Sequence, residues 1–225
     1  MSNVTNLKSN LLNLIARVLR PLYRPIRNKK NYQFIDKEVK KRFDGHDLAL
    51  KNSIVIDLGA NRGDFSNWAI RQGAFVIAFE PDKKAFTALF NRLGKQENFH
   101  PINAAVSNKT SFADLYFHKN RMFDPIGYSI SSSLIEEKDN IDKNNFSRVL
   151  VFNLGEFLKE FKIKLIKIDI EGAEQSIWPV IERSFANIEF LLLEIHETNS
   201  NEFSTTIVDF IQRNNLASKW KIDWL

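Results

Sequence analysis

The sequence predicts an α/β fold in which a mostly parallel, doubly wound sheet carries helices on both faces. Short apolar runs rich in β-branched residues, such as Ile54 to Leu58, are typical of strands buried on both faces. Stretches with helical periodicity separate these runs at the spacing of βαβ units. Polar residues gather where the runs end, which is the edge at which such sheets bind ligands.

The elements follow from the apolar runs and from the residues at their ends. Asp64 is the expected N-cap of one helix, and Gly73 and Gly94 follow the ends of two helices. The expected strands are Ile54 to Leu58, Ala74 to Phe79, Phe99 to Val106, Leu165 to Ile170, Ile188 to Ile195 and a short edge strand Trp220 to Leu225. The expected helices are Ile35 to Leu50, Asp64 to Arg71, Lys83 to Leu93, Glu156 to Phe161, one after Glu174 that Pro179 breaks, and Ser204 to Asn214.

Between residues 107 and 153 the alternation of strands and helices stops. Ala113 to His118 and Val149 to Phe152 predict a small antiparallel addition, separated by a polar loop with Gly127 and several serines. A loop of this length in a compact domain is usually functional, although a solvated turn explains the serines equally well. We expect the loop to cover the site and to contact the substrate through four residues: Lys119, Arg121, Ser132 and Ser133.

The charge of the chain is concentrated near its start. Residues 1–35 hold seven Lys or Arg and no acid, which leaves 25 basic and 27 acidic residues elsewhere. A near-neutral main domain argues against a nucleic-acid partner. The chain has no cysteine, so it forms no disulfide and uses no thiolate chemistry, and it has no apolar run long enough for a spanning helix. We expect a cytoplasmic protein, with contact at the inner membrane face as a further possibility.

The basic N-terminal segment is expected to be an appendage, residues 1–35, to a main domain over residues 36–225. Its apolar residues between Leu7 and Leu22 share one helical face, and Pro21 and Pro25 end the helix. Such a helix packs on the domain, packs on a second subunit in an oligomer, or binds an anionic membrane surface through residues 7–30. An Arg-rich start without acids also resembles a mitochondrial presequence.

The loop after the first strand contains Gly59 and Gly63 four residues apart, with acids at both ends. Glycines allow positive φ and a close approach of the backbone to a ligand. The pattern is not the Gly-x-Gly-x-x-Gly that holds a pyrophosphate, and Asp57 and Asp64 would repel one. S-adenosylmethionine carries a sulfonium and an ammonium instead, so an acid-framed loop suits it. The cofactor residues expected here are Asp57, Gly59, Asn61, Gly63 and Phe65.

Further cofactor residues follow the second and third strands. Glu80 comes seventeen residues after Gly63, where its carboxylate can accept hydrogen bonds from both ribose hydroxyls, and Pro81 and Asp82 follow it. Glu80 would serve NAD equally well. At the end of the third strand, Ala104 leaves room for a flat ring and the amide of Asn103 can read its edge. A glycine turn that binds no ligand is the alternative interpretation of the whole loop.

Three residues at the ends of the fourth and fifth strands are the expected catalytic groups. His196 is suited to general-base work near neutral pH, and Asp169 and Glu171 are the other candidate bases. Asp169 is also a candidate cofactor ligand. With Glu171 or Glu194 it could hold Mg²⁺, but these ligands are few for a metal cage, so we expect no metal. Glu171 and Glu174 are alternatively first-turn acids of the next helix.

In order and spacing, six stretches resemble the FkbM family of S-adenosylmethionine-dependent methyltransferases over about residues 50 to 200. They are Ile56 to Gly63, Phe79-Glu80-Pro81-Asp82, Ala105-Val106-Ser107, Ser132-Ser133-Leu134, Lys167 to Glu174 and Leu193 to Glu197. The resemblance implies a Rossmann-like methyltransferase fold and O-methylation of a hydroxyl, often of a sugar in a glycan, glycolipid or natural product. Asn153-Leu154-Gly155 stands where many relatives have Thr-Leu-Asp.

Two rival functions come from other classes. A nicotinamide-dependent oxidoreductase would use the same Glu80, but the third glycine of its fingerprint is missing. A catalytically silent protein that binds a membrane surface would rest on the basic N-terminal helix alone. An N-methylating enzyme of nucleic acids would be expected to carry an Asn/Asp-Pro-Pro-aromatic motif after the fourth strand, where this chain has Asp169-Ile170-Glu171-Gly172.

Overall fold

A computed structural model describes residues 30–43, 46–121, 132–136, 138–196 and 201–222. Its main sheet has six strands in the order β3-β2-β1-β7-β8-β9, and every neighbouring pair is parallel. The strands are β1 (Ile54–Leu58), β2 (Phe75–Phe79), β3 (Phe99–Ile102), β7 (Ile163–Ile168), β8 (Ile188–Leu193) and β9 (Trp220–Ile222). The chain winds outward in both directions from β1 and β7, which places the switch point where such folds bind ligands between these two strands.

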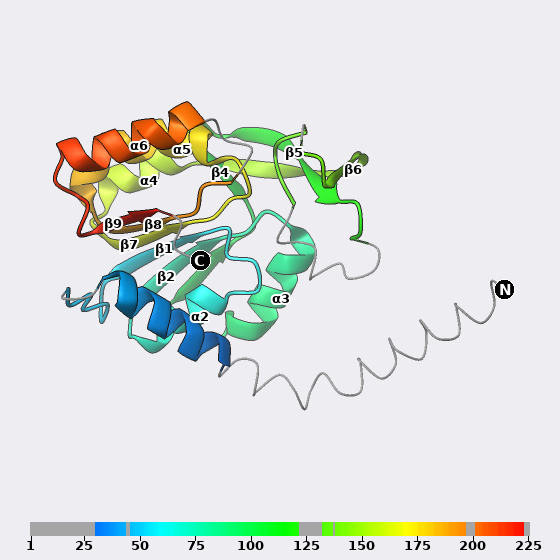
Figure 1. Cartoon of the computed structure of the whole chain (residues 1–225). Helices are drawn as coiled ribbons and strands as arrows, with labels where there is room; N and C mark the ends of the chain where they lie inside the picture. The colour runs from blue at the N-terminus through cyan, green and yellow to red at the C-terminus, as the bar shows by residue number, and fades with distance from the viewer. Residues whose placement is uncertain (1–29, 44–45, 122–131, 137, 197–200, 223–225) are drawn as a thin grey trace.

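Helices cover both faces of the main sheet (Figure 1). On one face lie α2 (Asp64–Arg71), α3 (Lys83–Leu93) and a helix over residues 30–42; on the other lie α4 (Leu154–Glu160), α5 (Glu174–Arg183) and α6 (Asn201–Arg213). Because successive strand residues point to opposite faces, Val55 packs in the core under α2 and α3, whereas Ile56 packs in the core under α4, α5 and α6. The predicted doubly wound α/β fold is confirmed.

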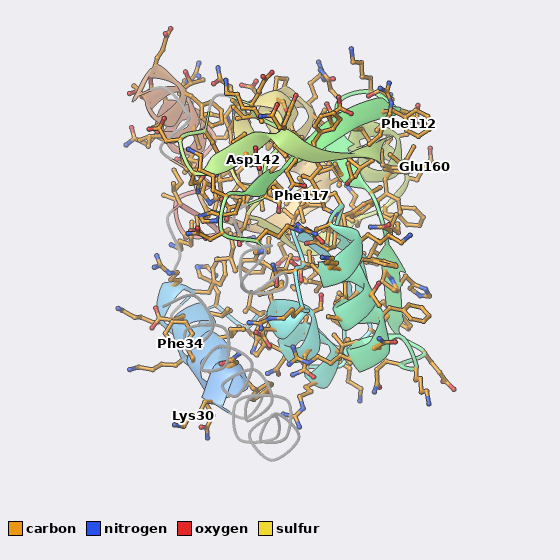
Figure 2. All side chains as sticks on the ribbon, turned by 90° about the vertical axis from the view of Figure 1, so that its right-hand side faces the viewer. Lys30, Phe34, Phe112, Phe117, Asp142 and Glu160 are labelled. Carbon is orange, nitrogen blue, oxygen red and sulfur yellow. The ribbon has the colours of Figure 1, made fainter. Side chains whose placement is uncertain are left out.

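A second, three-stranded sheet lies above the carboxyl ends of the main strands (Figure 1). It is built from β4 (Ala105–Ser107), β5 (Ser111–His118) and β6 (Ile141–Asn153) in the order β4-β6-β5. Figure 2 labels Phe112 and Phe117 on β5 and Asp142 on β6. The pair β5 and β6 is antiparallel, as predicted, but β4 and β6 are parallel, so the addition is mixed. The predicted strand Phe99 to Val106 is wrong as a single element: the chain turns at Asn103 and Ala104, and its two halves join different sheets.

Three local predictions also differ from the structure. Pro179 does not break its helix, because α5 continues through it to Arg183 while Trp178 and Ile181 are held in the core. Asp64 is the first residue of α2 and not its cap; the cap is Gly63, at φ +78°. The helix expected over Ile35 to Leu50 spans residues 30–42, and the chain to β1 is not helical where it is described.

Several predictions lie outside the described residues. They are the N-terminal helix up to residue 29, the polar loop with Gly127 (residues 122–131), Glu197, and the last residues of the expected edge strand (223–225). Within the described part of the chain, no helix is long and apolar enough to cross a membrane.

Candidate active site

A cavity opens at the carboxyl ends of β1, β2 and β7, beneath the small sheet. Its empty volume, including its open mouth, is about 650 Å³. Eight residues that the sequence predicted to bind cofactor or substrate, or to act in catalysis, line it together: Gly59, Asn61, Glu80, Pro81, Ala104, Ser132, Asp169 and Glu171. These residues come from five separate segments of the chain, which the fold brings together at this edge of the sheet.

The turn after β1 passes directly against the turn after β7. Gly59 has a φ of +75°, and a Cβ atom at this position would lie 1.8 Å from the carbonyl oxygen of Asp169. The amides of Gly59 and Ala60 both donate to the carbonyl oxygen of Phe79, each at a distance of 3.0 Å. No other residue fits at position 59, because both the backbone conformation and the close approach require glycine. This glycine turn, hereafter the cradle, presents backbone atoms and no bulky side chain at position 59.

Glu80 is a buried carboxylate at the wall of this cradle, with only 5% of its surface exposed. Its Oε2 accepts from the amide of Asn61 at 2.7 Å, and its Oε1 accepts from the amide of Asp82 at 2.8 Å. Burial raises its pKa from an ordinary 4.5 to about 8, although both backbone hydrogen bonds lower it. Each oxygen keeps a lone pair, so the carboxylate can accept further hydrogen bonds from a pair of ligand hydroxyls.

Asp57 and Asp64 do not frame the cavity, which corrects the electrostatic argument drawn from the loop. Asp57 is fully buried, where it accepts a 2.6 Å hydrogen bond from the hydroxyl of Ser66. Asp64 forms an ion pair with Arg92. The acids at the cavity wall are instead Glu80, Asp169 and Glu171.

Lys167 is a functional candidate that the sequence reading missed. Its buried ammonium lies 2.9 Å from Asp169 Oδ2 and 3.6 Å from Asp57 Oδ1, and it donates to the carbonyl oxygen of Gly59 at 3.0 Å. Burial lowers its pKa, but the two carboxylates outweigh burial and raise it. Lys167 therefore ties Asp169 to the glycine turn. The signal was present as a lysine two residues before Asp169, in the apolar half of a strand whose other lysine, Lys164, lies near its start.

Four predicted cofactor residues support the cavity from behind and are not among the residues that line it. Gly63 packs against α3, since a Cβ there would lie 2.3 Å from Leu89 Cδ1, and Phe65 is buried beside Trp68. The remaining two act through hydrogen bonds: Asp82 caps α3 by accepting from the amides of Lys84 and Ala85, and Asn103 donates to the carbonyl oxygens of Glu80 and Pro81.

His196 lies beside the cavity among three carboxylates. Its Nδ1 lies 2.8 Å from Glu174 Oε1, while its Nε2 lies 3.5 Å from Glu171 Oε2 and 3.7 Å from Asp169 Oδ1. Glu174 is itself buried, and its Oε1 also accepts from the amides of Ile170 and Gly172. The structure thus brings Asp169, Glu171 and His196 together. Glu174, predicted only as a first-turn acid, is therefore also a partner of His196.

Burial and the neighbouring carboxylates set the protonation state of His196. Burial lowers the pKa of His196, but the hydrogen bonds to Glu171 and Glu174 outweigh it and raise the pKa to about 10. Glu171 shows the complement: burial raises its pKa, but His196 and Lys138 hold it below its ordinary value. At neutral pH, His196 is an imidazolium in the ligand-free protein, and it must give up that proton before it can serve as a base.

The same three residues could present one ligand atom each to a divalent cation. Asp169, Glu171 and His196 offer atoms that all lie within 4.8 Å of one another. Both carboxylates are already paired, Asp169 with Lys167 at 2.9 Å and Glu171 with Lys138 at 2.8 Å. A metal ion would have to displace these ammonium groups and the proton of the histidine.

The base of the insertion is anchored to the site by an ion pair. Arg121 forms two hydrogen bonds with the carboxylate of Asp82, stacks over the ring of Phe117 at 3.6 Å, and also contacts the hydroxyl of Ser132. Ser133 donates to the carbonyl oxygen of Glu171 at 2.7 Å. These contacts place Ser132 in the cavity wall.

Of the four residues predicted to contact substrate, the structure therefore places only Ser132 at the cavity. The guanidinium of Arg121 is engaged by Asp82, and the side chain of Ser133 is engaged by Glu171. Lys119 donates to the carbonyl oxygen of Asp139 at 2.6 Å. Three of the four thus hold the insertion in place.

One family model and two solved structures are similar to this chain. A family model described as the methyltransferase FkbM domain matches residues 57–215. The crystal structure of a methyltransferase FkbM from Methylobacillus flagellatus KT is 15% identical, with a TM-score of 0.44, and the match covers 72% of this chain and 37% of that one. A putative RNA methyltransferase from Pyrococcus horikoshii is 17% identical, with a TM-score of 0.34, over 73% of this chain and 60% of that one.

The matches with solved structures leave a large part of each neighbour uncovered. The chain spans 37% of the first structure and 60% of the second. No curated protein matched the sequence.

Proposed function

This chain belongs to the FkbM methyltransferase family, and on that basis we propose that it transfers the methyl group of S-adenosylmethionine to a hydroxyl oxygen. The acceptor hydroxyl in this proposal belongs to a sugar in a glycan, glycolipid or natural product. The observation that carries the proposal is the cavity at the β1 and β7 switch point, where a glycine cradle, a buried carboxylate and a second acidic cluster meet.

The donor fits the residues present in the cradle. Glu80 offers two carboxylate oxygens to the ribose hydroxyls, and Ala104 leaves space beside it for a flat base. Gly59 holds the turn open where a side chain would collide with Asp169. Asp169 and Glu171 provide negative charge for a ligand that carries a sulfonium and an ammonium. S-adenosylmethionine supplies an activated methyl group, so the protein has to hold the acceptor oxygen about 3 Å from it, in line with the breaking bond.

The acceptor hydroxyl must lose its proton during the transfer, and His196 is the proposed base. The protonated state of His196 in the ligand-free protein makes this role conditional on a drop in its pKa. A cation bound in the cavity lowers that pKa, because like charges repel. Glu174 keeps its hold on Nδ1, which leaves Nε2 toward Asp169 and Glu171. A proton taken up at Nε2 then returns to solvent after the product leaves.

Calorimetry with two ligands tests the donor assignment. We expect S-adenosylhomocysteine to bind with micromolar affinity and NADH to give no heat, because the cradle lacks the dinucleotide fingerprint. Heat with NADH but not with S-adenosylhomocysteine would contradict the proposal and would indicate a nicotinamide-dependent oxidoreductase instead.

The base and the acceptor need separate tests. A His196→Ala variant with undiminished turnover across several pH values would remove the base assignment, and turnover that survives EDTA would remove any role for a metal. Mass spectrometry of glycans from cells with and without the gene is expected to show the loss of one methyl group from a sugar. An unchanged glycan profile would remove the sugar from the proposal.

A further inference from the structure

A second hollow adjoins the donor cavity and takes no part in the chemistry described above. It lies between the small sheet and the start of α5, and its empty volume, including its open mouth, is about 940 Å³. Leu134 and Ala173 line both this hollow and the donor cavity. The two spaces are therefore neighbours that share a wall.

The side chains that line this hollow, hereafter the serine groove, are all uncharged. Its polar residues are Ser107 on β4, Ser111 on β5, and Gln175 and Ser176 on α5. Its apolar surface includes Leu134 and Ile135. The groove thus offers hydroxyl and amide groups together with an apolar surface, whereas the donor cavity is lined in part by carboxylates.

The polar groups of the groove are available to a ligand. Within the described part of the chain, the side chains of Ser111 and Gln175 make no hydrogen bond to another residue. Ser176 donates to the carbonyl oxygen of Ala173 at 2.7 Å, which leaves its oxygen free to accept. The amide of Gln175 can both donate and accept, as a ligand with several hydroxyl groups requires.

This combination selects the class of ligand. A charged group would find no opposite charge among the residues that line the groove. A purely apolar ligand would make no hydrogen bond to the serine and glutamine side chains. A sugar has hydroxyls around its rim and C–H groups on its faces, so it can satisfy the polar groups while its face rests on Leu134 and Ile135.

We propose that the serine groove binds a neutral sugar unit of the acceptor, next to the unit whose hydroxyl receives the methyl group. This inference rests on the function proposed above. The turn between the two spaces gives the direction: Glu171 lines the donor cavity, Gly172 lines the groove, and Ala173 lines both. An acceptor held in the groove that extends across this turn brings its next hydroxyl to Asp169 and Glu171.

Titration by amide-resolved NMR tests the proposal in protein saturated with S-adenosylhomocysteine. The probes are the neutral methyl glycosides of glucose, galactose, mannose and rhamnose, each added separately, and sodium glucuronate as a charged sugar of similar size. At least one neutral glycoside is expected to bind with millimolar affinity and to shift the amides of Ser111, Gln175 and Ser176. Glucuronate is expected to bind at least about tenfold more weakly.

Two variants and a matched control locate the binding. Ser111→Phe fills the groove from β5, and Gln175→Leu removes the amide from an exposed position of α5 without touching the core. Each is expected to weaken the neutral glycoside at least about fivefold. Asp114→Phe places the same ring on the opposite face of β5 and is expected to leave binding unchanged.

The outcomes separate this proposal from the function on which it rests. Protein that binds S-adenosylhomocysteine but shows no groove shifts with any neutral glycoside, or binds glucuronate as well as the neutral sugars, overturns the groove and leaves the donor site standing. Protein that does not bind S-adenosylhomocysteine overturns the function itself.

Discussion

The buried carboxylate of Glu80 makes donor binding dependent on pH. In the ligand-free protein its pKa is about 8, because burial disfavours the charged form. A ribose needs the ionised carboxylate as its acceptor. Binding of the donor should therefore weaken as the pH falls below this value, and the variant Glu80→Gln, which cannot ionise, should lose that dependence.

The size of the effect follows from the ionised fraction. With a pKa of about 8, roughly a tenth of Glu80 is ionised at pH 7 and roughly a hundredth at pH 6. If only the ionised form binds, the affinity at pH 6 is about 100-fold lower than at pH 9, a difference of about 2.7 kcal/mol. A partial contribution from the neutral form makes the slope shallower without changing its sign.

Calorimetry with 5′-methylthioadenosine measures this dependence. The ligand carries both ribose hydroxyls but lacks the amino acid group, so its own ionisation does not intrude between pH 6 and pH 9. Glu97→Gln is the matched control, because Glu97 is exposed and lies away from the cavity lining. A wild-type affinity that is constant over this range, or a slope that survives in Glu80→Gln, would refute the reasoning.

The same shift predicts how the stability of the ligand-free protein varies with pH. Folding raises the pKa of Glu80, so the folded state holds a proton that the unfolded chain has released. The unfolding free energy should fall as the pH rises from 4.5 toward about 8, by about 5 kcal/mol in total from this group. His196 adds a fall between 6.5 and about 10, because its pKa is also raised. Urea unfolding of wild type and Glu80→Gln at pH 5 and pH 6.5 isolates the part due to Glu80.

Three substitutions test other parts of the structure. Glu174→Gln removes a charged partner of His196 and should lower the pKa of the histidine by at least about one unit, measured by its ring resonances in NMR. Glu182→Gln, on the same helix, should leave the pKa of His196 unchanged. Equal pKa values in both variants would contradict the assigned contact. Gly59→Ala should abolish binding of S-adenosylhomocysteine in calorimetry, since its Cβ would meet the Asp169 carbonyl at 1.8 Å; retained binding would count against the cradle. Trp178→Ala should lower the unfolding free energy, measured in urea, by about 3–5 kcal/mol, because the side chain is 4% exposed in the core under α6. A loss below about 1 kcal/mol would contradict that packing.

Several features that depend on neighbours in the sequence were predicted correctly. The β-branched run of β1 and the helical period of α3 are local patterns, and the structure begins and ends both elements where those patterns predict. The turn at Gly59 and Gly63 could also be predicted from the sequence, because a positive φ is a property of a single residue and glycine adopts it readily. The gathering of Glu80 and Asp169 at one edge followed from topology, because parallel strands all end on the same side of the sheet.

Features that depend on burial and on distant partners were decided only by the folded chain. Asp57 and Asp169 are both acids at the end of a strand in the sequence, but Asp57 is fully buried, where it accepts from Ser66, while Asp169 lines the cavity. The strand Phe99 to Val106 looked continuous, but its halves found hydrogen-bonding partners in two different sheets.

The protonation state of His196 was likewise decided only by the folded chain. The sequence established that a histidine follows β8 and that carboxylates follow β7, and hence that acid–base groups meet at this edge. Only the tertiary structure placed Glu174 at 2.8 Å from Nδ1 and Glu171 at 3.5 Å from Nε2, which raises the pKa to about 10. The reason is physical: the type of residue sets an ordinary pKa, whereas burial and the distance to other charges, which set the actual one, exist only once the chain has folded.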